Sequence, residues 1–182
     1  MIRPIVQTGS PVLRDQAKPV DVSYIGSKEF KRLIEDMFET MRDAPGVGLA
    51  APQIGISQQI VVIEDRPEFL EDIDEEYMKE RLREAVPPTV LVNPVIELIG
   101  DETVTFFEGC LSVAGFAAMT PRHKKVRVKA LNEKAEEIVL EWEGWPARIL
   151  QHELDHLAGN LYIDRMDSRT FTTTDHFESD DE

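Results

Sequence analysis

The amino-acid sequence predicts an α+β fold in which antiparallel β-sheets surround a central C-terminal helix, with one further helix near the N-terminus. Two observations support this class. The strongest helical patterns lie far apart, before residue 43 and after residue 144, and the strand-like runs between them do not alternate regularly with helices. Two of these runs are also separated only by a short polar turn, which predicts an antiparallel hairpin.

The first helix is expected to begin after Ser27, whose side chain can cap it, and to continue to about Arg42. Pro45, Gly46 and Gly48 then interrupt the helical pattern and open a loop of small residues, GVGLAAPQIG. The apolar residues of the helix recur at the spacing of one buried face, which comprises Phe30, Leu33, Ile34, Met37, Phe38 and Met41.

The expected strands cover residues 58–64, 89–99, 103–107, 124–131 and 137–142. In the last two, apolar and polar residues alternate as in half-buried strands, and the turn at 132–134 lies between them. The last helix is expected to begin near Trp145, because Pro146 suits a first helical turn, and to end before Gly159.

Composition limits the functions that the chain can have. The 182 residues carry a formal net charge of -15, so DNA or RNA binding is not expected, and no apolar run is long enough to cross a bilayer. The single cysteine, Cys110, excludes an intrachain disulfide and suits a reducing compartment. We expect a monomeric protein of the cytoplasm, or the mature form of an organellar protein.

The chain is expected to form one domain over residues 1–172. Residues 65–88 are mostly acidic and are interpreted as a surface insert, with a short helix from Glu75 to Glu84 and no identifiable chemistry. Residues 173–182 are polar and acidic and are expected to be disordered.

The clearest chemical motif is QHELDH at residues 151–156. His152 and His156 are four residues apart on the expected helix, so both imidazoles project from one face and can bind one divalent ion. Glu153 can reach a water molecule on that ion. The alternative is two ordinary buried histidines, but an HExxH sequence seldom occurs by chance.

A catalytic site of this kind needs a third protein ligand. In one protease class this ligand is a histidine six residues after the second, but Tyr162 stands there, and the acidic candidates Asp175 and Glu178 lie in the tail. Cys110, in the sequence EGCLS, is a better candidate. As alternatives, this cysteine is an inert buried residue or a nucleophile paired with a histidine.

Three motifs in order, GVGLAAPQ at 46–53, EGCLS at 108–112 and QHELDH at 151–156, resemble those of the peptide deformylase family without mismatch. The similarity extends from about residue 3 to 171, and the C-terminal motif context is closer to the organellar-like branch. The resemblance implies Cys110, His152 and His156 as metal ligands, with Glu153 as general base. It also implies oxyanion donors from the Gln53 side chain and the Leu111 backbone.

The resemblance implies a substrate as well: N-formylmethionyl ends of nascent chains at the ribosome, from which formate is released. The acidic tail makes docking on ribosomal RNA through that tail doubtful. Gly48 would bind the peptide through its backbone, and Arg148, which is not on the histidine face, is expected at the rim of the pocket or in a surface ion pair. The expected lining of the methionine pocket is Val47, Phe106, Glu108, Trp145, Arg148, Ile149 and His152.

We further predict that Glu108, Arg122 and Asp155 bond to one another around the ligands and orient them. A sulfur and nitrogen ligand set suits zinc on affinity grounds, whereas the resemblance implies ferrous iron as the native ion, with zinc, nickel or cobalt able to replace it. Two other functions stay open at this point: an HExxH zinc endopeptidase that does not need Cys110, and a metal-containing binding protein without catalysis.

Overall fold

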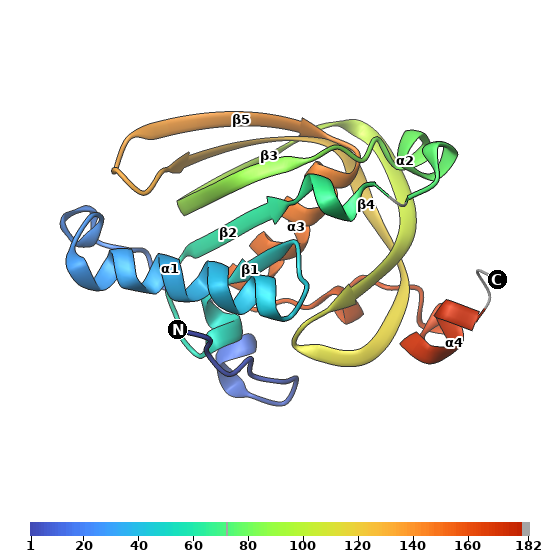
Figure 1. Ribbon diagram of the computed structural model, residues 1–182, viewed down its shortest axis with the longest axis horizontal. Helices are drawn as coiled ribbons and strands as arrows, with labels where there is room; N and C mark the ends of the chain where they lie inside the picture. The colour runs from blue at the N-terminus through green and yellow to red at the C-terminus, as the bar shows by residue number, and fades with distance from the viewer. Residues whose placement is uncertain (72, 180–182) are drawn as a thin grey trace.

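The computed structural model describes residues 1–71 and 73–179 and confirms the α+β class. Within these residues, six strands form one antiparallel sheet in the order β1-β2-β3-β4-β5, with β6 added to β4. The strands are β1 (Gly48–Ala50), β2 (Ile60–Asp65), β3 (Val86–Cys110), β4 (Val113–Leu131), β5 (Glu137–Glu143) and β6 (Thr172–Thr173). The sheet curves around a central helix, α3 (Trp145–Leu157) (Figure 1).

The N-terminal helix α1 (Lys28–Asp43) begins as expected, because the Ser27 side chain accepts a hydrogen bond from the backbone N–H of Phe30 at 3.1 Å. Its apolar face packs on the outer side of β1 and β2 and is buried, except that Phe38 is partly exposed. This packing fixes the start of the loop that leads from α1 into β1 and β2.

The β3 strand is longer than expected. The runs at 89–99 and 103–107 are parts of a single strand, because the register with β4 shifts between Ile99 and Thr103 and the strand then continues. Gly100 has a φ of 73° at this bulge, which explains why the sequence there resembles a turn. The long β3–β4 hairpin brings Cys110, at its tip, to the C-terminal helix.

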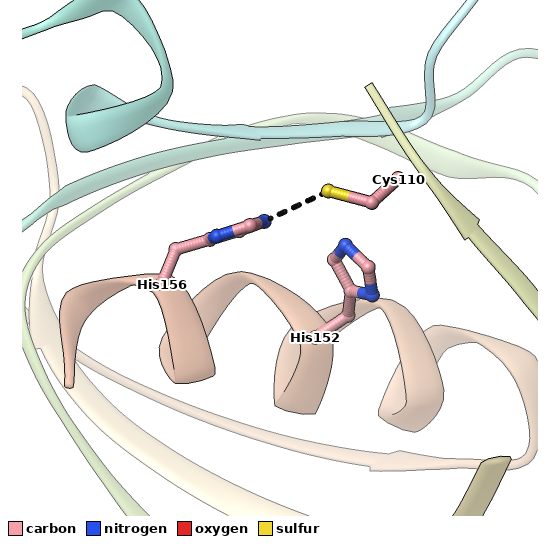
Figure 2. Close-up of side chains that lie close together, drawn as sticks. All are labelled: Cys110, His152 and His156. Carbon is pink, nitrogen blue, oxygen red and sulfur yellow. Dashed lines mark hydrogen bonds between the residues drawn. The ribbon is translucent and has the colours of Figure 1, made fainter. Parts of the chain in front are cut away.

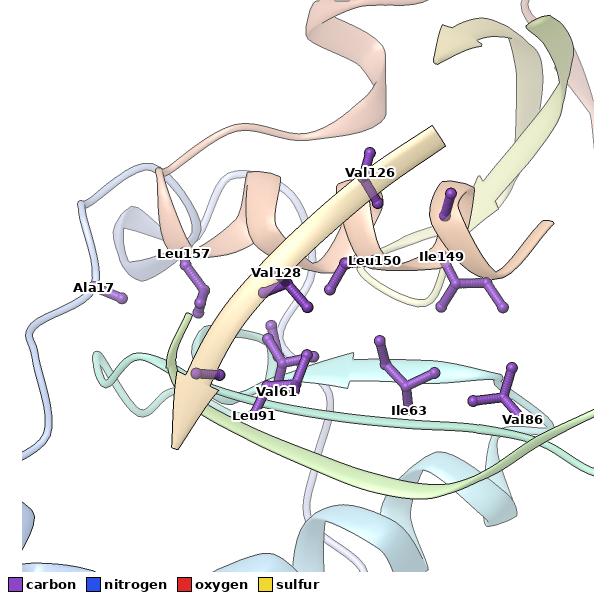
Figure 3. Close-up of a cluster of buried hydrophobic side chains, with 13 residues drawn as sticks. Ala17, Val61, Ile63, Val86, Leu91, Val126, Val128, Ile149, Leu150 and Leu157 are labelled. Carbon is purple, nitrogen blue, oxygen red and sulfur yellow. The ribbon is translucent and has the colours of Figure 1, made fainter. Parts of the chain in front are cut away.

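A hydrophobic core lies between α3 and the inner face of the sheet (Figure 3). Ile149, Leu150 and Leu157 of the helix pack against Val61 and Leu91, which belong to β2 and β3. Val128 of β4 closes the other side of the same cluster. Most residues of the helix are therefore buried by the surrounding protein.

Two boundaries differ from those expected. The insert begins and ends in the core, since Asp65 is the fully buried last residue of β2 and Val86 belongs to the core cluster at the start of β3. Its helix α2 (Glu75–Arg81) is shorter than expected because Leu82 adopts a left-handed conformation, with φ of 47°. No helix in the described part of the chain has the length and apolar character needed to span a membrane.

The structure describes residues 173–179 of the expected disordered tail as part of a short strand and a helix. Thr172 and Thr173 form β6 by pairing with Ala117 and Phe116, and α4 (Thr174–Ser179) follows. The Phe171 ring stacks on the Phe116 ring, with centroids 4.9 Å apart, and this contact anchors the segment. Residues 180–182 of the predicted tail lie outside the described residues.

Candidate metal centre

Helix α3 and the end of β3 bring the three expected ligands together. Pro146 begins the helix and Gly159, with φ of 77°, ends it, so His152 and His156 lie one turn apart on its inner side. Cys110 comes from the tip of the β3–β4 hairpin, and its Sγ lies 3.4 Å from Nε2 of His156 (Figure 2). One ligand atom from each residue lies within 4.8 Å of the others.

The residues fit a divalent metal ion. One thiol and two imidazoles form the mixed sulfur and nitrogen set that transition metals of this type prefer. Beside them, Oε2 of Glu153 is buried and has no hydrogen-bond partner among the described residues. An unsatisfied buried carboxylate oxygen is costly, and an ion with its water would give that oxygen a partner.

Gly48 determines how close Glu153 can come to the loop. A Cβ atom built on Gly48 would lie 2.7 Å from Cδ of Glu153 and 2.8 Å from its Cγ, too close for any other residue at position 48. Burial raises the pKa of the Glu153 carboxyl to about 7. This value suits a group that accepts and returns a proton near neutral pH.

Buried ion pairs surround His152, as the sequence predicts. The Arg122 guanidinium donates two hydrogen bonds of 2.8 Å to Glu108 and one of 2.5 Å to Asp155. Oε2 of Glu108 lies 3.0 Å from Nδ1 of His152. Burial disfavours the charged Glu108 carboxyl, but the hydrogen bonds from Arg122 and His152 outweigh this effect and hold its pKa well below the ordinary value.

Gln53 is fully buried and points its amide toward the ligands. Its Nε2 lies 3.7 Å from Sγ of Cys110 and 3.4 Å from Oγ of Ser112. Its Oε1 accepts a hydrogen bond of 2.9 Å from the backbone N–H of Ala50. Gln53 therefore ties down the loop and also presents an N–H beside Cys110. Leu111, which follows Cys110 in the chain, lines the same pocket as Gln53.

A pocket of about 490 Å³ opens at this centre. Arg148 lines it but is not at a surface rim: it is 2% exposed and bonds to Glu108 and to the carbonyl oxygens of Thr120 and Val104. That expectation is wrong because the sheet covers the helix on this side too. The other expected residues that line the pocket are Val47, Gly48, Glu108, Trp145, Ile149 and His152.

Phe106 differs from the expectation. It does not line the pocket, whereas Phe107 does. Its ring instead lies behind the wall, 5.3 Å from the guanidinium carbon of Arg148. Tyr162, at the position where one protease class has its third histidine, is buried with its ring nearly parallel to that of His152, at a centroid distance of 6.3 Å. Tyr162 is thus a packing neighbour of His152.

Sequence reasoning missed two neighbours of the centre. Arg165 donates two hydrogen bonds of 2.7 Å to Asp155 and so shares this carboxylate with Arg122. Thr174, from the supposedly disordered tail, lines the pocket. Arg165 could have been anticipated from the charges, because the two buried carboxylates of Glu108 and Asp155 require more than one positively charged partner. No local signal marks Thr174.

Comparisons with known proteins agree with the geometry. The chain matches the family model described as polypeptide deformylase over residues 2–172. It is 44% identical over 174 residues to the chloroplastic peptide deformylase 1A of Solanum lycopersicum, covering 96% of this chain but only 63% of that protein. It is 42% identical over 168 residues to the mitochondrial peptide deformylase of Homo sapiens, covering 92% of this chain and 69% of that protein. The expected likeness to organellar members is confirmed.

A solved structure gives the same result. The structure is the Met-Ala-Ser-bound class I type b peptide deformylase of Acinetobacter baumannii, which superimposes with a TM-score of 0.80 at 33% identity. The match covers 91% of this chain and 99% of that one. The family match spans nearly the whole sequence, and the expected ligands cluster at a pocket in a fold shared with that enzyme. The chain belongs to the polypeptide deformylase family.

Proposed function

We propose that this protein is a metal-dependent hydrolase that removes the formyl group from N-formylmethionyl peptides and releases formate. The main support for the proposal is that four residues meet at one pocket. Cys110, His152 and His156 are placed to act as metal ligands, and the buried Glu153 carboxylate lies beside them. Family membership supports the same activity.

Cys110 Sγ and the two imidazoles would hold one divalent ion, which when bound would supply Lewis-acid polarisation of the formyl oxygen and a more acidic water molecule. Glu153 accepts a proton from the attacking water and later gives it to the leaving amine, so the C–N bond breaks to formate and a free N-terminus. The Gln53 amide and the Leu111 backbone N–H stabilise the negative charge that develops on the formyl oxygen.

Substrate recognition would combine an edge strand with a side-chain pocket. β1, which contains Gly48, is the last strand at one end of the sheet order, so a peptide can pair with its free edge. The methionine side chain would then enter the pocket beside Trp145, Arg148 and Ile149. The Acinetobacter baumannii enzyme was solved with a Met-Ala-Ser peptide bound, which supports this class of ligand.

We also propose ferrous iron as the native ion, as the family resemblance implies, with zinc, nickel or cobalt able to replace it, because a site of one thiolate and two imidazoles accepts each of these ions. Nascent chains at the ribosome supply the substrate, and the protein acts as a monomer in the cytoplasm or, as the names of the plant and human relatives indicate for those proteins, inside an organelle.

The proposal is tested by formate release from a formyl-Met tripeptide, with protein prepared without oxygen. Wild type and an exposed control, Glu133→Ala, should turn over. Glu153→Ala should lose activity while it keeps the metal, and Cys110→Ser should lose both. An endopeptidase would instead cleave internal peptide bonds and tolerate Cys110→Ser. No formate from metal-loaded wild type would overturn the proposal.

A further inference from the structure

The end of the acidic insert packs beside one wall of the pocket, which Trp145 and Arg148 line and which Phe106 supports from behind. Arg81 is the last residue of α2, and Leu82 and Arg83 follow it. All three lie close to residues that line the pocket or that pack behind its lining. The Arg81 guanidinium carbon lies 4.4 Å from the ring centroid of Phe106 and 3.5 Å from that of Tyr77. The side chain of Arg81 is only 15% exposed, so this contact is largely shielded from water.

Phe106 connects Arg81 to the pocket. The guanidinium carbon of Arg148 lies 5.3 Å from the centroid of the same ring, and Arg148 lines the pocket and bonds to Glu108 at 2.7 Å. One aromatic ring thus contacts both a guanidinium of the insert and a guanidinium that lines the pocket. If Arg81 were removed, Phe106 would gain room to move and the side chain of Arg148 would lose part of its support.

Arg83 supports the wall at a second point. It donates two hydrogen bonds, of 2.9 Å and 3.1 Å, to the fully buried carboxylate of Asp65. Its guanidinium carbon lies 5.3 Å from the ring of Trp145, which lines the pocket. The ion pair with Asp65 restricts the position of the Arg83 guanidinium, and the guanidinium in turn restricts the position of the Trp145 ring.

The backbone of Arg81 and Leu82 also packs closely against Gly144. A Cβ atom on Gly144, the residue before Trp145, would lie 2.5 Å from the carbonyl oxygen of Arg81 and 3.1 Å from that of Leu82. Leu82 adopts a left-handed φ of 47° and Gly144 one of 68°, conformations that the close approach requires. The insert is therefore pressed against the first turn of the helix that carries the metal ligands.

We propose that Arg81 and Arg83 are positioning residues for the side-chain pocket, which hold Phe106, Arg148 and Trp145 in place and so set the size of the first side chain that the pocket accepts. The inference rests on the proposed function. A rigid wall excludes a large side chain and packs closely on methionine, whereas a loose wall does neither.

The central experiment measures kcat and KM of Arg81→Ala with formyl-Met and formyl-Phe tripeptides. KM for formyl-Met should rise about fivefold with kcat nearly unchanged, since the loss of one cation–π contact weakens packing and leaves the reacting groups in place. The enlarged pocket should accept formyl-Phe better, so the preference for Met over Phe should fall by about tenfold.

Controls separate the ring contact from other effects. Lys79→Ala removes the same charge from the same helix at an exposed position, and Glu80→Gln removes the ion pair of Arg81 but leaves its ring contacts. Both should keep the wild-type preference. Phe106→Leu removes the shared ring and should lower the preference as Arg81→Ala does, and Arg81→Lys should recover part of it.

The outcomes distinguish this inference from the proposed function. If metal-loaded wild type releases no formate, the proposed function fails. If wild type is active but Arg81→Ala and Phe106→Leu both keep the preference for Met over Phe, the positioning role fails. A parallel loss of kcat, metal content and thermal stability in Arg81→Ala, without a change in preference, would equally overturn it in favour of a purely structural contact.

Discussion

The carboxylate of Glu108 lies 3.0 Å from Nδ1 of His152, which leaves the other ring nitrogen of this histidine to face Cys110. The same carboxylate is held by Arg122, which also bonds to Asp155. Orientation of a ligand imidazole by a buried carboxylate, itself fixed by an arginine, is how outer contacts tune metal affinity.

Arg122→Ala should therefore lower metal affinity by about ten- to a hundredfold, because Glu108 loses two hydrogen bonds and no longer fixes His152. The measurement is a competition titration of zinc or cobalt against a chromophoric chelator. Arg127→Ala, which removes an exposed arginine paired with Glu97 and Glu141, is the matched control and should bind metal as wild type does. Equal affinities in both variants would refute the role of Arg122.

Gly48→Ala should reduce kcat by about a hundredfold while the metal content stays the same, because the new methyl group displaces the Glu153 carboxylate. Steady-state kinetics and metal analysis of the same preparation check this. Gly109→Ala is a useful comparison, since its methyl group would meet only the carbonyl oxygen of Phe116 at an ordinary 3.6 Å, and its loss should be smaller. Similar kinetics for wild type and Gly48→Ala would show that the carboxylate tolerates displacement.

Ser27→Ala should lower the free energy of unfolding by about 1 kcal/mol, since the backbone N–H of Phe30 loses its capping acceptor. Urea denaturation followed by circular dichroism measures the change. Ser27→Asp provides the control, because aspartate caps equally well and should restore the stability. If the two variants unfold at the same urea concentration, the cap contributes nothing.

Phe171→Ala should loosen the C-terminal strand, because the stack on Phe116 anchors β6 to β4. An aromatic pair of this kind contributes about 1 kcal/mol, so amide exchange at Thr172 and Thr173 should accelerate about fivefold. Hydrogen exchange read by mass spectrometry reports this change. Phe69→Ala, in the insert, should leave that exchange unaltered, and unchanged exchange in Phe171→Ala would show that the stack does not hold the strand.

The sequence predicted best the features that depend on local signals. The cap at Ser27, the hairpin turn after Leu131 and the helix that begins at Trp145 all follow from short-range chemistry, and the structure has each of them. The metal ligands were also within reach, because His152 and His156 are fixed relative to each other by helical geometry. Cys110 needed the family resemblance, since its position depends on the path of a long hairpin.

Features that depend on tertiary packing were not predictable in the same way. Helical periodicity places Arg148 away from the histidine face, but the curved sheet covers that side as well and buries its guanidinium. Phe107 lines the pocket in place of Phe106, whose ring packs near the Arg148 guanidinium instead, a tertiary contact that the sequence does not reveal. The tail is polar and acidic in sequence, and its described part is held by tertiary contacts, the pairing of β6 with β4 and the stack of Phe171 on Phe116.

The carboxylate of Glu108 is shared between two parts of the site: one oxygen accepts a hydrogen bond from Arg148 of the side-chain pocket, and the other lies against the ligand His152. Occupancy of the pocket and occupancy of the metal site therefore act on one common group. Such linkage is reciprocal by thermodynamic necessity. If a bound ion changes the affinity for a peptide by some factor, a bound peptide changes the affinity for the ion by the same factor. On the proposed function, the metal affinity of the protein would therefore differ between its peptide-bound and its peptide-free state.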